Sequence, residues 1–221
     1  REIDNNEWGL ALTTELHYLI EKYFKEKESH TLKSIFFGGG TPSLMDPALV
    51  KKIINESKYL FNQNANKSIE ISLEANPGSI FKDKLKDFFD SGINRISIGV
   101  QSFDRENLRF LGRDHSVYDA KKALELSRKI FKNLSFDLIY ALPEQSIESW
   151  EYSLNEAFQF EPDHLSLYQL TIEKGTAFNR LYRSGRLSLI EDDLASDMYL
   201  VTDKITKDNQ MPAYEISNHS K

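Results

Sequence analysis

The 221-residue sequence predicts an α/β protein built on a parallel sheet. Short apolar runs typical of buried strands alternate with segments of helical periodicity along almost the whole chain. Successive strand-like runs begin roughly 25 to 40 residues apart, the spacing of right-handed βαβ units. Because no linker, low-complexity tract or shift in composition separates these units, we expect a single domain over residues 1–221.

The strands are predicted from apolar runs and from alternation of apolar and polar residues. Strict alternation in SIEISLE and RISIGV is the period of a strand with two different faces. We expect the main strands at residues 34–37, 68–74, 95–100, 134–142 and 164–172. A last strand is expected at 213–216.

The helices are predicted from apolar positions that recur every three or four residues. Asp46 before Pro47 is an N-cap followed by proline at the first helical position, and Gly92 ends a later helix. We expect helices at residues 7–27, 47–60, 81–89, 105–111, 117–131, 147–160, 176–184 and 192–208.

Composition excludes several classes of function. The formal charge is −6 with both signs spread along the chain, so no basic face indicates nucleic-acid binding. No apolar stretch approaches the roughly 20 residues that span a bilayer. The chain has no cysteine, which excludes disulfides, a thiolate nucleophile and any cysteine-ligated metal centre on these residues. Its five histidines lack HxH or HxxxH spacing, so we expect no metal ligands.

Polar side chains follow all five main strands, at the end where ligands bind in parallel α/β folds. This convergence favours a (βα) barrel, although the alternation of elements also fits an open doubly wound sheet. Arg113, Asp114 and His115 follow in the long segment after the third strand. The strand-end groups are Gly38 to Thr41, Glu74 with Asn76, Gln101 with Ser102, Asp137 with Tyr140, and Tyr168 with Gln169 and Thr171.

A lone polar residue after a strand is usually a turn former or a helix cap, and Asn76-Pro77-Gly78 fits that interpretation. Glu74 and Asp137 are different because they lie within or beside apolar runs, where an unpaired carboxylate is costly. Asp137 either pairs with a buried cation or holds a hydroxyl or amine of a ligand.

Three consecutive glycines, Gly38 to Gly40, indicate close approach of backbone to a ligand, because so many glycines cost ordering entropy. The sequence GGGTP lacks the lysine of a phosphate-binding loop, and it does not fit GxGxxG. Glycine carbonyls can accept hydrogen bonds from an ammonium group, and their N–H groups can donate to a carboxylate. The stretch therefore predicts a site for an amino acid rather than for a pyrophosphate.

Six strings in order, GGGTPSL, EANPG, GVQSFD, LGRDH, DLIYALPEQ and LSLYQLTIEKGTAF, carry a family resemblance. Over about residues 34–219 the chain resembles the radical S-adenosylmethionine (radical SAM) proteins grouped with oxygen-independent coproporphyrinogen III oxidase, HemN. GVQSFD and YQLTIEKGTAF look more like the heme-chaperone branch, HemW. The resemblance implies a partial (βα)6 TIM-like barrel whose first strand is missing from this chain.

The resemblance also implies a binding site for S-adenosylmethionine. The methionyl amino group is expected on the glycines, and Glu74 matches a carboxylate that helps to hold the cofactor. Several other positions match residues that contact adenosylmethionine in the oxidase branch. The expected binding residues are Gly39, Gly40, Thr41, Glu74, Gln101, Arg113, Asp137 and Thr171.

The family's chemistry also requires a [4Fe–4S] cluster on a CxxxCxxC loop, and this chain has no cysteine. We therefore expect the cluster loop and a C-terminal domain to lie outside residues 1–221, and the chain alone to be inactive. Heme or a porphyrinogen, and a heme-acceptor protein, are the implied partners, in the cytoplasm. His219, outside any heme motif, is expected to be an exposed terminal residue.

Two rival interpretations remain open. One is a degenerate family member that binds adenosylmethionine or heme without radical chemistry. The other is an unrelated (βα) enzyme in which Glu74 and Asp137 are an acid–base pair, as in glycoside hydrolysis. Trp8 and Trp150 lie on expected helices, where packing is their expected role, so no aromatic platform supports a sugar site.

Overall fold

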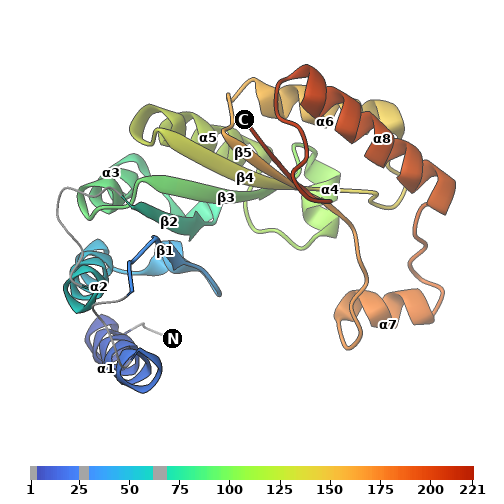
Figure 1. The fold of residues 1–221 in the computed structure, drawn as a ribbon. Coiled ribbons are helices and arrows are strands. Elements are labelled where there is room, and N and C mark those ends of the chain that lie inside the picture. The colour runs from blue at the N-terminus through green and yellow to red at the C-terminus, as the bar shows by residue number, and fades with distance from the viewer. Residues whose placement is uncertain (1–3, 25–29, 62–68) are drawn as a thin grey trace.

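A computed structural model describes residues 4–24, 30–61 and 69–221. Six of the described segments form one sheet, with the strands side by side in sequence order (Figure 1). The strands are β1 Ser34–Phe37, β2 Glu70–Ala75, β3 Arg95–Gln101, β4 Asn133–Tyr140, β5 His164–Gln169 and β6 Asn218–Ser220. Strands β1 to β5 are parallel, and β6 is antiparallel to β5. A parallel sheet in sequence order is the arrangement of a (βα) barrel segment, so the predicted α/β fold is confirmed.

Most of the described α-helices begin at a residue whose side chain caps them; α3 (Lys82–Asp90) and α8 (Asp192–Asp208) have no such side-chain hydrogen bond. The Asp46 side chain accepts a hydrogen bond from the Ala48 N–H at 2.8 Å, and Ser116 with Asp119 forms a capping box. Helices α2, α3, α5, α6 and α8 cover the outer side of the sheet, whereas α7 stands apart from it (Figure 1). The helices are α1 Asn5–Tyr23, α2 Pro47–Leu60, α3 Lys82–Asp90, α4 Arg105–Phe110, α5 Val117–Ile130, α6 Ile147–Phe158, α7 Ala177–Arg183 and α8 Asp192–Asp208. Two 3₁₀ turns, Pro42–Leu44 and Pro77–Ser79, follow β1 and β2.

The two faces of the sheet differ in chemistry, because successive side chains of a strand point to opposite faces. The outer face packs beneath the helices and forms the core; its members include Leu73, Ile96, Ile98, Phe136, Leu138 and Leu165. The residues that alternate with these along each strand point to the inner face, and many of them are polar. Register pairs Glu74 with Ser97, Ser97 with Ser135, and Asp137 with Ser166, so these side chains share that face.

The two tryptophans have different environments. Trp150 is only 1% exposed, stacks on Tyr140 with ring centroids 5.1 Å apart, and donates its Nε1–H to Thr202 Oγ1 at 2.7 Å. Trp8 on α1 is 58% exposed. The packing role expected for both residues is therefore confirmed for Trp150 and wrong for Trp8.

The C-terminal strand differs from the prediction. Residues 213–216 form no strand; instead the chain reverses there, with the Tyr214 N–H donating to the Asn218 carbonyl at 3.1 Å. The strand is the short β6 beyond this turn, where His219 pairs with Leu165. Pairing on the sheet buries His219 to 2% exposure, so its predicted exposure is wrong.

Other differences concern element ends. Strands predicted to reach residues 142 and 172 end at Tyr140 and Gln169. The first helix ends at Tyr23, and the predicted positions 25–27 and 68 lie outside the described residues. Within the described ranges, no helix is both long and apolar enough to cross a bilayer.

Candidate functional site

A polar pocket of about 220 Å³ lies at the carboxyl ends of the first four strands. It contains six of the eight residues that the sequence predicts for a binding site. They come from the loop after β1, from β2, β3 and β4, and from the segment after α4. The lining residues are Gly40, Thr41, Pro42, Glu74, Ala75, Asn76, Ser97, Gly99, Gln101, Arg113 and Asp137.

The glycines after β1 form a backbone ledge at this pocket. Gly39 and Gly40 have φ values of +79° and +59°, and a Cβ on either residue would meet no atom within 4 Å. Packing therefore does not explain these two glycines, whereas a Cβ at Gly38 would collide with the Phe36 ring. The Gly39 N–H donates to Glu74 Oε2 at 3.2 Å. The ledge thus offers bare backbone to open space beside a carboxylate.

Arg113 brings a positive charge to the pocket. Its Nη2 donates to the Gly99 carbonyl at 3.5 Å, and among the described residues its buried Nε has no hydrogen-bond partner. Gly99 makes room for this arrangement, since a Cβ there would lie 3.0 Å from Gln101 Nε2 and 3.2 Å from Arg113 Nη2. A half-buried guanidinium whose Nε still has a free donor fits an acceptor such as a carboxylate.

Gln101 ends β3 in a left-handed backbone conformation, with φ +68°. This conformation is uncommon for a residue other than glycine, and it is concentrated at binding and active sites. The side chain of Gln101 lines the pocket on the same side as Ser97 and Gly99.

Asp137 carries a half-buried carboxyl on the inner face of β4. Its pKa is raised to about 6, mainly by burial; the nearby charge of Glu74 acts in the same direction, whereas Ser166, Arg113 and Arg95 oppose the rise. No lysine or arginine in the part of the chain described here forms an ion pair with Asp137. Of the two alternatives open at the sequence level, pairing with a buried cation is therefore not observed. Its carboxyl is available to a ligand.

Two predicted residues do not line the pocket. Gly39 borders it through its hydrogen bond to Glu74. Thr171 is exposed beyond the end of β5, and its hydroxyl donates to the Gln169 carbonyl at 3.2 Å. The structure does not bring Thr171 together with the other predicted residues.

Sequence reasoning missed five lining residues, of which Pro42 and Ala75 directly follow or adjoin predicted ones; the other three are Asn76, Ser97 and Gly99. Ser97 and Gly99 share the phase of Gln101 in RISIGVQ, so the alternation of that strand could have placed them on the same face. Asn76 was assigned to a turn alone. It does cap the turn, accepting from the Gly78 N–H at 2.9 Å, and it also lines the pocket.

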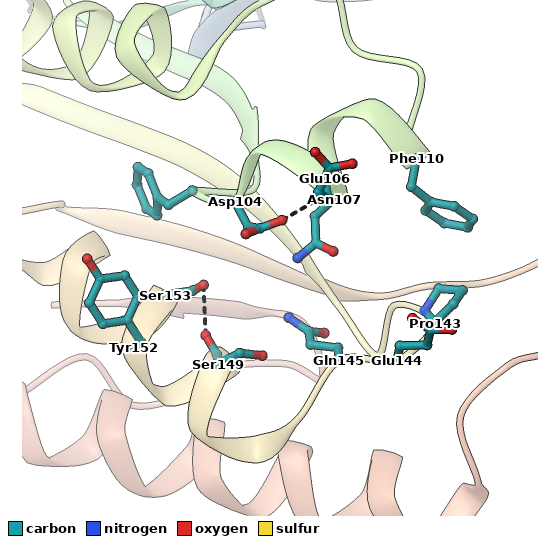
Figure 2. Close-up of a pocket in the computed structure, with 11 residues that line it drawn as sticks. Asp104, Glu106, Asn107, Phe110, Pro143, Glu144, Gln145, Ser149, Tyr152 and Ser153 are labelled. Atoms are coloured by element: carbon teal, nitrogen blue, oxygen red, sulfur yellow. Dashed lines mark hydrogen bonds between the residues drawn. The ribbon is translucent and has the colours of Figure 1, made fainter.

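A larger cavity of about 690 Å³ lies between α4 and α6 (Figure 2). Its polar groups are occupied locally: Asp104 accepts from the Asn107 N–H at 2.8 Å, and the Ser153 hydroxyl donates to the Ser149 carbonyl at 3.0 Å. Glu106 and Glu144 add carboxylates, but none of the predicted site residues lies here. The strand-end pocket is therefore the better candidate site.

The 221 residues supply no cysteine ligand for an iron–sulfur cluster. The described residues also include no group of three or more His, Asp or Glu placed to bind a metal ion. The thiolates that iron–sulfur clusters require are therefore not supplied by these 221 residues.

Comparison with known proteins identifies related sequences. Residues 13–157 match the family model described as the radical SAM superfamily. The chain is 39% identical to radical S-adenosyl methionine domain-containing protein 1, mitochondrial, of Danio rerio, over 96% of this chain and 47% of that protein. It is 36% identical to the heme chaperone HemW of Bacillus subtilis, over 86% of this chain and 50% of that protein. The chain thus spans about half the length of the curated relatives it matches.

Solved structures agree with the sequence comparisons. The radical SAM enzyme coproporphyrinogen III oxidase (HemN) from Escherichia coli superposes with a TM-score of 0.73 at 25% identity, over 86% of this chain and 43% of that one. The Elp3 protein of Methanocaldococcus infernus superposes with a TM-score of 0.67 at 21% identity, over 89% of this chain and 50% of that one, a likeness of fold alone.

Proposed function

This chain belongs to the radical SAM superfamily, and from that premise we propose that its strand-end pocket binds S-adenosylmethionine. The superfamily implies this cofactor together with a [4Fe–4S] cluster. The observation that carries the proposal is Arg113, whose buried Nε has no hydrogen-bond partner among the residues that the structure describes, in the same pocket as the open glycine ledge. A ligand with both a carboxylate and an ammonium group matches this combination.

Each pocket residue has a role that suits part of this ligand. Arg113 pairs with the methionyl carboxylate, and Glu74 with the glycine carbonyls accepts hydrogen bonds from the amino group. Gln101 and Asp137 provide hydrogen bonds to the adenosyl part, where hydroxyl and amine groups lie. Thr171 lies outside this pocket and remains a predicted contact only.

The cluster does not fit on this chain, because the chain has no cysteine. We propose that its ligands belong to a part of the protein outside these 221 residues. When both are bound, the cluster would supply the electron and adenosylmethionine the group that is reduced in the one-electron chemistry of the superfamily. The residues described here bind and orient that cofactor.

For the whole protein we propose a role in heme metabolism, as a heme chaperone of the HemW type in the cytoplasm. Its proposed partners are heme and a heme-acceptor protein. Sequence relatives that carry the heme-chaperone name support this choice. Coproporphyrinogen III oxidation is the second candidate, supported by the superposition on HemN.

The test of the cofactor site is calorimetric titration of the intact protein with S-adenosylmethionine under anaerobic conditions. We expect Glu74→Ala and Arg113→Ala each to weaken binding by about 10- to 100-fold, the effect of losing a charge-assisted hydrogen bond. Glu106→Gln in the other cavity is the matched control and leaves affinity unchanged. Unchanged binding in both pocket variants, with circular dichroism showing a retained fold, contradicts the proposal.

A second measurement separates the two candidate roles. The intact protein is titrated with heme and followed by absorbance, and it is also assayed for decarboxylation of coproporphyrinogen III. Heme binding without turnover supports the chaperone, whereas turnover supports the oxidase.

A further inference from the structure

A buried histidine, His115, lies two residues after Arg113 but does not line the pocket. It is 4% exposed, and its Nε2 lies 3.1 Å from the Val100 carbonyl oxygen. A carbonyl oxygen only accepts hydrogen bonds, so this ring nitrogen carries a hydrogen and donates it. His115 therefore connects the segment between α4 and α5 to the end of β3.

The carbonyl that His115 contacts belongs to a strained turn. The Ser102 N–H donates to the same Val100 oxygen at 2.9 Å, which closes a three-residue γ-turn around Gln101. The φ of Gln101 is +68°, so this is the rare and strained form of the turn. Such a conformation persists only where the surrounding structure holds it in place. The hydrogen bond from His115 is one restraint of this kind.

The Gln101 and Arg113 side chains meet over Gly99. The pairing of β3 with β4 shifts in register between Ile98 and Gln101, at the place where the turn forms. A Cβ on Gly99 would lie 3.0 Å from Gln101 Nε2 and 3.2 Å from Arg113 Nη2. Both side chains line the pocket from there. The turn at the end of β3 therefore bears directly on how these two groups are placed.

The segment that carries Arg113 is fixed at both of its ends. The N–H groups of Gly112 and Arg113 donate back to carbonyls of α4, the pair of hydrogen bonds that defines a Schellman motif. Ser116 caps the start of α5. Between these ends, His115 supplies a link to β3, and Arg113 itself makes only a long contact of 3.5 Å with a β3 carbonyl.

The surroundings of His115 favour a neutral ring. Burial lowers its pKa and the charge of Arg113 acts in the same direction, whereas the hydrogen bond to Val100 and the charges of Asp114 and Asp119 oppose the shift. Its buried Nδ1 has no hydrogen-bond partner among the residues that the structure describes. A second proton on the ring would therefore have no acceptor there. The single ring hydrogen belongs on Nε2, directed at Val100.

We propose that His115 is a positioning residue for the pocket: its Nε2–H holds the Val100 carbonyl, and through it the strained turn that sets Gln101 beside Arg113. His115 touches no ligand itself. That the ligand is S-adenosylmethionine rests on the proposed function, whereas the placement of Gln101 and Arg113 does not.

The test compares two variants of similar side-chain length, His115→Gln and His115→Met. Glutamine can place an N–H close to the position of Nε2, whereas methionine has no donor. The side-chain N–H signals of Gln101 and Arg113 are followed by NMR in the intact, ligand-free protein, with Gln101→Ala and Arg113→Ala for assignment. We expect both signals to move toward their values in an unfolded chain in His115→Met and to stay near wild type in His115→Gln.

Calorimetric titration with S-adenosylmethionine measures the effect on binding. We expect His115→Met to weaken binding about 5- to 10-fold, the scale of one hydrogen bond, and His115→Gln to remain within about twofold of wild type. His17→Met, at a partly exposed position on α1, is the control and leaves affinity unchanged. In a Gln101→Ala background His115→Met should cost less than in wild type, because the side chain that it positions is gone. A general loss of stability would cost the same in both backgrounds.

Unchanged Gln101 and Arg113 signals in folded His115→Met overturn the inference, and so does an equal displacement in His115→Gln or an equal cost in the two backgrounds. Should His115→Met not fold, as judged by circular dichroism, His115→Asn replaces it, because its amide lies at the position of Nδ1 and not of Nε2. Displaced signals without adenosylmethionine binding by the wild type contradict the proposed function alone. Binding by the wild type with undisplaced signals in the variant contradicts this inference alone.

Discussion

The outer and inner faces of the sheet are made by the same strands, yet the outer face forms the hydrophobic core and the inner face carries the polar pocket. On the outer face, Phe136 is fully buried among apolar side chains beneath the helices. On the inner face, its neighbour Asp137 is half-buried beside Ser166 and lines the pocket with Glu74 and Arg113. Burial of the apolar side chains on the outer face stabilises the fold. Burial of the polar side chains on the inner face destabilises it. Adjacent residues of one strand should therefore respond to substitution with opposite signs.

The largest expected effect is on the outer face. Phe136→Ala should lower the free energy of unfolding by about 3–5 kcal/mol, because it removes a fully buried ring and leaves a cavity. Urea denaturation followed by circular dichroism measures this. A loss below about 1 kcal/mol would show that neighbouring side chains move to fill the cavity. It would contradict the contrast drawn between the two faces.

Asp137→Asn should have the opposite effect, and the effect should depend on pH. The pKa of Asp137 is raised from 3.8 to about 6 in the folded protein, so the folded state binds more protons than the unfolded state between these values. Stability from this group is present below the unfolded pKa and is lost as pH rises through 6. The variant should be more stable than wild type by roughly 3 kcal/mol at pH 8 and nearly equal at pH 3.5. Equal stability at both pH values contradicts the prediction.

Gly40→Ala tests the ledge at the strand ends. Its φ of +59° disfavours any residue with a Cβ, although the space beside it is open. We expect a loss of about 1 kcal/mol in unfolding free energy from backbone strain, together with weaker adenosylmethionine binding. Calorimetry and urea denaturation measure the two effects. Full affinity in this variant would show that the ledge does not approach the ligand.

The smallest effect is expected at the amino end of the inner face. Glu70 accepts from Arg95 Nη1 at 3.0 Å, and both side chains are partly exposed. Glu70→Gln should lower stability by less than about 1 kcal/mol, as for other solvent-accessible ion pairs, and leave ligand affinity unchanged. Reduced affinity would show that the site extends along the whole inner face.

Alternation along the strands made much of this arrangement predictable. In RISIGVQ the phase that buries Ile96 and Ile98 also directs Ser97, Gly99 and Gln101 to the opposite face. Glu74 and Asp137 stood out because a carboxylate within an apolar run needs an explanation. The carboxyl ends of parallel strands meet, so residues far apart in the sequence could be assigned to one pocket.

Features that depend on pairing between distant segments were not predictable in this way. Strand β6 has three residues, too few for a period, and its burial of His219 arises only from pairing with Leu165. The partners of Asn218 and Ser166 follow from the same pairing. The left-handed backbone of Gln101 has no local signal, because glutamine carries no preference for it.

The unequal burial of the two tryptophans gives the protein a fluorescent reporter of its own. The Trp150 indole on α6 is buried against Tyr140 and Thr202, so its fluorescence reports a buried environment. The Trp8 indole on α1 is exposed to water. A Trp8→Phe variant would leave one indole, whose emission shifts to longer wavelength only when the helical layer over β4 separates from the sheet. Because that layer lies on the face opposite the ligand pocket, the signal reports unfolding without interference from the site.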